Sequence, residues 1–416
     1  MRIGKFAKTH NISIDTVRHY MNIKLIIPEK RAGQYYFDHK CNDDIKDIIY
    51  LKDLGFTLHE IKEIFQYKRL GRLSSLHNNQ YYKRLFVEKY DEIEEKMKKF
   101  ETSKQKLKDE ITKLNMVEVH HHKQIGVPFS ALSLFECKKC STQLSISDGD
   151  IQHHQIINGT LHCACNENYL IKDGILFTSD TVEDANRLLT QDQNIDTFSH
   201  FLMDYIKETD EEFIDSMFKN IDLAFKKLEI DKLDHKTMMH LGTGFGFSLR
   251  QVYDSIPQKT LYIAVDHNYE RHQVLKSILE TYDNKKNILF ICSDFLNIPI
   301  KNQAIDYLID TGTSNYSAYH KSFLLKEIQH YLKSKSYLIG SYMYYSNFHV
   351  QHKMIEEPYR KNFQLEYIKK KIDNLNYNPI YTKTFLYSNK SPGKYELEIL
   401  EGENVFHYTY IGKRLG

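Results

Sequence analysis

The sequence predicts a multidomain protein: an α-helical winged helix-turn-helix with a long coiled-coil helix, then a small β ribbon, then an α/β Rossmann-like domain. Three observations support this prediction. The 416 residues are enough for roughly three domains of ~150 residues each. Four of the six cysteines fall in two close pairs, and a glycine-rich turn in the second half of the chain follows an apolar run.

The composition excludes collagen-like and fully disordered chains, because 41% of the residues are hydrophobic and only 17 are Gly and 7 Pro. The formal net charge is +2, and the basic excess is N-terminal. Residues 1–75 hold 14 Lys and Arg against 9 Asp and Glu, whereas the rest of the chain holds 43 against 46. We therefore expect a polyanion to dock on the N-terminal segment.

No apolar run reaches the ~18 residues that a membrane span needs, and the start MRIGKFAKTHN lacks the apolar core of a signal peptide. We therefore expect a cytoplasmic protein that has no membrane partner. In that compartment, paired cysteines favour a metal site over a disulfide.

The first 75 residues carry a pattern of four helices and a basic wing. Apolar residues at helical spacing predict two short helices about a polar break at 10–11, and Ser13 opens the second. The segment 29–38, EKRAGQYYFD, predicts a basic turn between two short aromatic strands. A third helix is expected from about Asp43, and a T-x-x-E capping box at 57–60 starts a fourth.

The predicted second helix and the wing supply the candidate DNA contacts. A recognition helix presents long polar side chains to base edges in the major groove, while basic side chains hold phosphates. Arg18 can reach either a guanine edge or a phosphate. The alternative is a small helical bundle whose polar face is only solvated. The candidates are Ser13, Thr16, Arg18, His19 and Tyr20 on the helix, and Lys30, Arg31, Tyr35 and Tyr36 in the wing.

Residues 1 to about 70 resemble the DNA-binding domain of the MerR family of transcriptional regulators. The matching features are I-G-x-x-A-K, S-x-x-T-x-R-x-Y, the exit from Leu25 to Pro28, the aromatic wing and L-G-F-[ST]-L-x-E-I. The sequence departs from the family pattern at Asn11, at His19 and at Gln34 with Tyr35. The resemblance implies dimers that bind a pseudo-palindromic double-stranded promoter with an overlong spacer. They distort that promoter so that RNA polymerase, an indirect partner, can use it.

Residues 76–122 are predicted to form a dimerisation helix. Its apolar positions alternate in steps of four and three, which is a heptad seam, with Lys104 at the one polar position. We expect a homodimer through the 86–114 coiled coil, which pairs antiparallel in the MerR family. The alternative is that this helix packs on the chain's own C-terminal domain. The seam consists of Phe86, Tyr90, Ile93, Met97, Phe100, Leu107, Ile111 and Leu114.

Four cysteines predict a structural Zn2+ site in a ribbon spanning residues 130–180. Cys137 and Cys140 form a C-x-x-C pair, and Cys163 and Cys165 form a C-x-C pair 22 residues later. Zinc prefers four soft ligands in a tetrahedron, and a small ribbon gains folding energy from the metal. The alternatives are free thiols, or His162 in place of one thiolate. The surrounding text, ECKKCSTQL, NGTLHCAC and NYLIKDGILF, resembles the N-terminal zinc ribbon of bacterial large-subunit rRNA guanine methyltransferases. The histidines at 120–122 and 153–154 are interpreted as solvated loop residues.

A glycine-rich turn indicates nucleoside binding within residues 185–416, after a helical stretch over about 185–230. The segment MMHLGTGFGFSL places Gly242, Gly244 and Gly246 after an apolar run and ahead of a helix, so the backbone can approach a bound nucleoside. Asp266 ends the next apolar strand, where a carboxylate can accept hydrogen bonds from ribose hydroxyls.

The strands that follow the turn carry a second pair of candidate residues. Asp294 and Phe295 come after a third apolar strand, and two further strands complete a parallel sheet. This series resembles a class I S-adenosylmethionine (SAM)-dependent methyltransferase over about residues 235–415. The resemblance implies SAM as cofactor, with the three glycines on its amino acid part, Asp266 on ribose, and Asp294 with Phe295 on adenine. A NAD-binding Rossmann domain and a plain α/β domain are the alternatives.

Two features depart from the methyltransferase pattern. His240 stands where an acidic residue commonly lies two positions before the first glycine, and the fourth strand ends in D-T-G-T-S-N-Y. Asp310 and Tyr316 are candidates for lining the acceptor side, or are structural. Methyl transfer from a sulfonium needs mainly in-line positioning, so the missing general base does not exclude catalysis.

Three functional hypotheses follow. The first is a dimeric MerR-type regulator whose C-terminal module senses or modifies a ligand and so biases DNA binding. The second is a methyltransferase of RNA or a small molecule, whose winged helix recruits it to nucleic acid or controls its own gene. The third is a SAM sensor without turnover.

Overall fold

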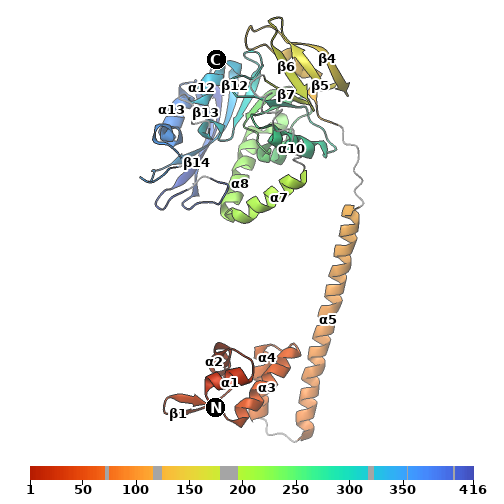
Figure 1. The fold of residues 1–416 in the computed structure, drawn as a ribbon, viewed down its shortest axis with the longest axis vertical. Coiled ribbons are helices and arrows are strands. Elements are labelled where there is room, and N and C mark those ends of the chain that lie inside the picture. Colours follow the sequence, from red (N-terminus) through yellow and green to blue (C-terminus); the bar gives the residue numbers. More distant parts are fainter. Residues whose placement is uncertain (71–74, 116–123, 179–194, 317–322, 354, 397–398) are drawn as a thin grey trace. The chain divides into compact units, whose positions relative to one another are not determined.

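The computed structural model describes residues 1–70, 75–115, 124–178, 195–316, 323–353, 355–396 and 399–416. The chain divides into two compact units, Met1–Val119 and His120–Gly416, and each is described by itself. Figure 1 shows the ribbon of each unit, with elements labelled where there is room.

The N-terminal unit has the predicted helices and wing. Ser13 caps the second helix by accepting a hydrogen bond from the Thr16 amide at 2.9 Å. Thr57 and Glu60 form the predicted capping box, because the Thr57 amide donates to Glu60 at 2.7 Å and the Glu60 amide donates to Thr57 Oγ1 at 3.3 Å. The elements are α1 (Ile3–Thr9), α2 (Ile14–Asn22), β1 (Glu29–Arg31), β2 (Gln34–Tyr36), α3 (His39–Asp53), α4 (Leu58–Leu70) and α5 (Ser75–Asn115).

One small core holds α1 to α4 together. Phe6 of α1 stacks on Phe37, which follows the wing, with ring centroids 4.3 Å apart. Val17 of α2 and Ile45 of α3 are fully buried beside them. The strands β1 and β2 pair antiparallel and remain exposed, so the wing projects from this core.

The long helix α5 contacts the helical core through residues of its N-terminal half. Phe86 packs edge to face on Phe56, with ring centroids 5.4 Å apart, and Lys89 bridges Glu60 and Glu92 at 2.6 Å each. Beyond this contact the apolar seam is exposed along the helix: Tyr90 66%, Ile93 39%, Met97 65%, Phe100 72%, Leu107 65%, Ile111 57% and Leu114 67%.

The C-terminal unit is built on a 12-stranded mixed sheet in the order β13-β14-β12-β11-β8-β9-β10-β7-β6-β5-β3, with β4 paired to β5. Its strands are β3 (Val127–Pro128), β4 (Ser145–Gln152), β5 (Gln155–His162), β6 (Asn168–Lys172), β7 (Ile175–Phe177), β8 (Thr237–Leu241), β9 (Leu261–Asp266), β10 (Ile288–Cys292), β11 (Ile305–Asp310), β12 (Leu332–Tyr345), β13 (Tyr377–Ser388) and β14 (Val405–Arg414).

Helices cover both faces of the sheet's centre. The helices α8, α9 and α10 bury apolar residues on one face, while α12 and α13 bury theirs in the core on the other. The α-helices are α7 (Ile195–Glu208), α8 (Glu211–Leu228), α9 (Phe247–Val252), α10 (Tyr269–Glu280), α11 (Thr313–Tyr316), α12 (Leu324–Ile328) and α13 (Leu365–Asp373). Short 3-10 turns are η1 (Phe129–Leu134), η2 (Ile230–Lys232), η3 (Tyr253–Ser255), η5 (Gln329–Tyr331) and η6 (Glu357–Phe363).

The central strands β10, β9, β8, β11 and β12 run parallel, as the alternation of strands and helices predicts. The strand β14 pairs antiparallel with β12, and the edge strand β13 pairs antiparallel with β14, a reversal that the alternation of strands and helices does not predict. Because parallel strands end at one edge of the sheet, the segments after β8, β9 and β11 meet there.

The cysteine ribbon, which the sequence predicts as a separate domain over 130–180, joins this sheet. Its last strand, β7, pairs parallel with β10 through Ile175, Leu176 and Phe177. All three residues are fully buried, because β7 lies inside the sheet and has packed side chains on both faces. Within the described residues no helix is long and apolar enough to cross a membrane.

Candidate functional site

The outer face of α2 presents polar side chains. Arg18 and His19 are exposed, and Arg18 Nη1 lies 3.1 Å from Asp15 Oδ1. Thr16 is half-buried and its hydroxyl lies 2.8 Å from that of Ser13. Ser13 and Thr16 therefore fix the start of the helix, while Arg18 and His19 are the residues free to reach a ligand.

The structure corrects the assignment of Tyr20 as a DNA contact. Its side chain is only 4% exposed and belongs to the core formed by α1 to α4. It follows Val17 by three residues, so both side chains lie on the inward face of α2. Tyr20 is a packing residue.

The wing presents its candidate residues to solvent. Lys30 and Tyr35 face each other across the strand pair, and Lys30 Nζ lies 5.6 Å from the Tyr35 ring centroid. Arg31 Nη2 forms an ion pair with Glu29 at 2.6 Å, and Tyr36 is half-buried. A wing whose basic side chains are exposed on a two-stranded ribbon can approach a phosphate backbone.

Four cysteines of the ribbon meet at one point. The sulfur atoms of Cys137, Cys140, Cys163 and Cys165 all lie within 4.8 Å of one another. A tetrahedral zinc with Zn–S bonds of ~2.3 Å places its sulfurs roughly 3.8 Å apart, so this set fits the ion. The Thr142 hydroxyl lies 3.3 Å from Cys140 Sγ, beside the cluster.

Histidines are not part of this cluster. His162 Nδ1 lies 2.7 Å from Asn168 Oδ1, so this ring is engaged beside the cysteines and does not join them. His153 and His154 are exposed at the turn between β4 and β5, as predicted. Residues 120–122 lie outside the described residues.

The cysteine cluster is linked to the loop after β10. Lys138 lies between Cys137 and Cys140 in the sequence. Its Nζ is 2.8 Å from the Tyr331 hydroxyl and 4.5 Å from the Tyr331 ring centroid. The Tyr331 hydroxyl donates to the carbonyls of Ile298 at 2.9 Å and Leu296 at 3.5 Å. The Leu296 amide in turn donates to Asp294 at 2.8 Å.

The glycine-rich turn follows β8 at the edge where the parallel strands end. Gly242 and Gly244 have φ of +63° and +55°, which a residue with a side chain adopts only with strain. Asp266, at the end of β9, accepts hydrogen bonds from the Gly244 amide at 2.8 Å and the Asn268 amide at 2.9 Å. Asp266 is 2% exposed, so its carboxylate holds the turn in place.

Four sequence-predicted cofactor residues do not line the pocket that this turn borders: Gly246, Asp266, Asp294 and Phe295. A side chain at Gly246 would run into Leu275, so this glycine allows the turn to pack closely on α10. Phe295 packs against the main core, and the adenine contact stays a prediction.

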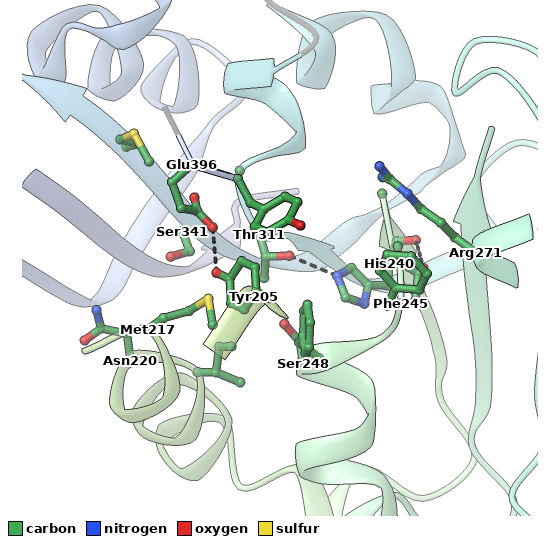
Figure 2. Close-up of a pocket in the computed structure, with 18 of the residues that line it drawn as sticks. Tyr205, Met217, Asn220, His240, Phe245, Ser248, Arg271, Thr311, Ser341 and Glu396 are labelled. Carbon is green, nitrogen blue, oxygen red and sulfur yellow. Dashed lines mark hydrogen bonds between the residues drawn. The ribbon is translucent and has the colours of Figure 1, made fainter. Parts of the chain in front are cut away.

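A cavity of about 610 Å³ opens beside the turn, large enough for a nucleoside with a second small molecule. All of its lining residues belong to the C-terminal unit, and Figure 2 shows Tyr205, Met217 and Asn220 from the helices α7 and α8 on one side of it and Ser341 from the sheet on another. The residues lining it are Phe201, Tyr205, Met217, Asn220, Ile221, His240, Gly242, Thr243, Gly244, Phe245, Phe247, Ser248, Asn268, Glu270, Arg271, Thr311, Gly312, Ser341, Met343, Tyr387, Tyr395, Glu396 and His407.

His240 lines the cavity as a neutral imidazole. Burial lowers its pKa to about 4, and its ring nitrogens lie 2.7 Å from the Tyr262 hydroxyl and 3.0 Å from Thr311 Oγ1. Figure 2 shows the contact between His240 and Thr311 as a dashed line. This chain thus has an uncharged imidazole at the position, two residues before the first glycine, where the methyltransferase pattern commonly has a carboxylate.

The structure also corrects one candidate for the acceptor side, Asp310. Asp310 is fully buried, does not line the cavity, and accepts a hydrogen bond from the Ser314 amide at 3.1 Å, so it caps α11. Burial raises the pKa of its carboxyl group. The helix α11 ends at Tyr316, whose side chain lies outside the described part of the structure.

Sequence reasoning missed the residues that close the cavity opposite the glycine turn. Tyr205 comes from α7 and Glu396 from the loop after β13, and the Tyr205 hydroxyl donates to Glu396 at 2.6 Å. Ser341 Oγ of β12 lies 2.8 Å from His407 Nδ1 of β14, and both residues also line the cavity. These residues are far apart in the sequence and carry no motif, so no local signal identifies them.

Comparisons with known proteins agree with this division. Residues 1–68 match the MerR HTH family regulatory protein domain, and residues 232–387 match a methyltransferase domain. The chain therefore carries a MerR-type helix-turn-helix domain followed by a methyltransferase domain. The second match favours methyl transfer over the NAD-binding alternative.

Two curated relatives cover the N-terminal unit. The HTH-type transcriptional activator mta of Bacillus subtilis (strain 168) is 27% identical over 96 residues, which are 23% of this chain and 36% of the relative. The heavy metal-dependent transcription regulator 2 of Rhizobium meliloti (strain 1021) is 35% identical over 66 residues, 15% and 45% of the two chains. This chain thus spans less than half the length of each relative.

Solved structures resemble the C-terminal unit. A SAM-dependent methyltransferase from Aquifex aeolicus has a TM-score of 0.32 and 16% identity, covering 45% of this chain and 88% of its own. A SAM-dependent methyltransferase from Clostridium acetobutylicum has a TM-score of 0.36 and 15% identity, covering 53% and 100%.

Proposed function

We propose that this chain is a dimeric transcriptional regulator that binds promoter DNA through its MerR-type domain, and that its methyltransferase domain binds SAM and so biases DNA binding. The observation that carries the proposal is the presence of two sites in one chain: an exposed recognition helix with its wing, and a cavity bordered by a glycine turn. The proposed partners are double-stranded promoter DNA, a second copy of the chain and, indirectly, RNA polymerase.

DNA binding rests on the exposed residues of α2 and the wing. Arg18 and His19 are positioned to reach base edges or phosphates, and Lys30 and Arg31 to reach the adjacent backbone. Two copies of this unit, paired through the exposed seam of α5, would address the two halves of a pseudo-palindrome. Distorting the DNA between the half-sites costs several kcal/mol, which contacts at both halves must offset.

Replacing Arg18 by Ala is expected to weaken duplex binding at least about fivefold, because a lost base or phosphate contact costs about 1–3 kcal/mol. The side chain is exposed, and its ion pair with Asp15 is a surface one, so the fold should survive. Fluorescence anisotropy with a labelled operator measures the affinity. Lys106→Ala, an exposed charge removed from α5 away from the seam, is the matched control. Equal affinity of Arg18→Ala and wild type would count against α2 as the reading helix.

SAM is proposed because the residues around the glycine turn fit it. A side chain added at Gly244 would meet no atom closer than the Gly242 carbonyl oxygen at 4.0 Å, so a ligand can lie directly against this backbone. Both oxygens of the Asp266 carboxylate already accept hydrogen bonds from backbone amides. We therefore propose that the half-buried Glu270, which lines the cavity, also accepts hydrogen bonds from the ribose hydroxyls. When bound, SAM supplies an electrophilic methyl group on a sulfonium.

One assay distinguishes a methyltransferase enzyme from a SAM sensor. Purified full-length protein is incubated with methyl-labelled SAM and a small-molecule extract, and bound and transferred label are measured separately. Label transferred to product identifies an enzyme, and label that binds without transfer identifies a sensor. A protein that binds neither SAM nor S-adenosylhomocysteine (SAH) contradicts the cofactor assignment.

We also propose that Cys137, Cys140, Cys163 and Cys165 hold one structural Zn2+. The donor set is closed and made of four thiolates, which is typical of structural sites. Through Lys138 and Tyr331 the site also supports the loop that contains Asp294.

Replacing Cys140 by Ser is therefore expected to lower the bound zinc from one ion per chain to well below one and to lower the Tm of the C-terminal unit by several degrees. SAM binding should weaken as well, because the loop at 294–298 loses its support. Metal analysis and calorimetry measure these effects. Cys41→Ala, which removes a thiol from the N-terminal core, should keep the metal. A Cys140→Ser protein with full zinc content would exclude this ligand set.

A further inference from the structure

The half of the cavity opposite the glycine turn is walled by aromatic rings. Tyr205 lies with its ring centroid 6.0 Å from that of Tyr395 and 6.1 Å from that of Phe247. Phe201 lies 5.3 Å from Tyr395 and 5.1 Å from Phe245, which connects this wall to the turn. Rings from α7, α9 and the loop after β13 therefore surround one space.

One carboxylate enters this aromatic space. Glu396 accepts a hydrogen bond from the Tyr205 hydroxyl at 2.6 Å, and Figure 2 shows the two side chains facing each other at the rim of the cavity. Among the described residues, no Lys, Arg or His forms an ion pair with Glu396. Burial raises the pKa of its carboxyl group, so a positive partner would stabilise the ionised form.

Two neighbouring cations contact rings of this wall but are not themselves lining residues, and Lys394 Nζ lies 4.8 Å from the Tyr395 ring centroid. Lys394 pairs with Asp204 at 3.2 Å, and the Arg250 guanidinium stacks against Phe198 and Phe247 at 5.2 and 5.3 Å. Neither lines the cavity. His407, which does, is held neutral because burial lowers its pKa to about 4.

The charges that line the cavity are thus unevenly placed. Arg271 and Glu270 belong to α10 beside the glycine turn, while Glu396 is the charged lining residue on the other side. Aromatic faces attract cations, and a carboxylate among them adds an acceptor for an N–H group. A neutral hydroxyl or a carboxylate acceptor would leave the half-buried Glu396 without a counter-charge.

We propose that this half of the cavity binds a small aliphatic amine as the methyl acceptor, with Glu396 pairing its ammonium group and Tyr205, Phe247 and Tyr395 contacting its N-substituents. This inference rests on the proposed binding of SAM in the other half. The amine would be the effector through which the regulator responds.

The proposed reaction moves one methyl group from SAM to the amine and releases one proton. The ammonium gives one N–H proton to the Glu396 carboxylate, which frees the nitrogen lone pair. That lone pair forms the new bond to the methyl carbon, while the bond from this carbon to sulfur breaks and its electron pair stays on sulfur. The products are the N-methylated amine, SAH and a proton on Glu396, which passes to water.

The test is calorimetric titration of the full-length protein, with and without SAH, using two probes of equal shape. Choline carries a quaternary ammonium, and 3,3-dimethyl-1-butanol is its neutral carbon counterpart. We expect choline to bind at least tenfold tighter than the neutral probe, and Glu396→Gln to remove this preference. Glu401→Gln, an exposed carboxylate five residues on, should keep it. Equal binding of the two probes, or no binding of either, would overturn the proposal.

A second pair of titrations separates this proposal from the cofactor assignment. SAM carries a sulfonium charge and SAH does not, so we expect Glu396→Gln to leave both affinities within about twofold of wild type. A selective loss of SAM binding would show that Glu396 pairs the sulfonium, which overturns the amine assignment. Failure of wild type to bind SAM and SAH refutes the cofactor proposal itself. Mass spectrometry should show choline formed from N,N-dimethylethanolamine and SAM by wild type and Glu401→Gln, and little by Glu396→Gln.

Discussion

A Met97→Glu, Phe100→Glu double variant is expected to be monomeric and to lose at least 100-fold in affinity for operator DNA. Both side chains are mostly exposed in one chain, 65% and 72%, and lie on the seam that a second α5 would cover. Burying each contributes about 1.5–3 kcal/mol, so four of them in a dimer contribute several kcal/mol. Glutamates there would also bring four charges into an apolar interface. Sedimentation gives the mass, and anisotropy with a labelled duplex gives the affinity.

Lys104→Leu is the matched control for this variant. It replaces the one polar position of the seam by an apolar residue, so the dimer should persist or tighten. The small core of α1 to α4 should stay folded in the double variant, because Met97 and Phe100 are not part of it. A double variant that remains a dimer would show that another surface pairs the chains.

Gly244→Val is expected to weaken SAM binding by at least 100-fold without unfolding the C-terminal unit. The residue has φ of +55°, so a β-branched side chain is strained there, and the added atoms would occupy the space beside the turn. No side chain has to move to make room for the added atoms. A loss of SAM binding would therefore come from the occupied space in the cavity and not from altered packing. Calorimetric titration with SAM and with SAH measures the change.

Gly402→Val separates backbone strain from loss of the cavity. Gly402 also has a positive φ, +88°, and open space around it, but it lies in an exposed loop away from the lining residues. It should lose a similar amount of stability and keep SAM binding. If both variants lose SAM binding equally, the effect is general strain, and the glycine turn is not the cofactor site.

Local features of the fold could be predicted from the sequence because their causes are local. The capping box of Thr57 with Glu60 and the wing between β1 and β2 each depend on residues within a few positions of one another. The spacing of four cysteines likewise predicts a cluster, and their sulfurs do meet. Tyr20 was misassigned because helical spacing alone does not say whether an amphipathic aromatic faces inward.

Long-range pairings could not be predicted in the same way. The ribbon joins the sheet because Ile175 pairs with Phe290, a contact between residues more than 100 positions apart. The far wall of the cavity has the same origin, since Tyr205 and Glu396 meet only when α7 and the loop after β13 pack together. Such contacts depend on the topology of the whole sheet, which single-residue patterns do not specify.

The most direct test of the account is to select genomic DNA fragments with the purified dimer, once with SAM and once without, and to sequence what is bound. We predict that the bound fragments share a pseudo-palindromic site, and that SAM changes either the affinity or the set of sites recovered. A dimer that recovers the same sites with the same affinity in both conditions would contradict the coupling of the two domains. A protein that enriches no site at all would contradict its role as a regulator.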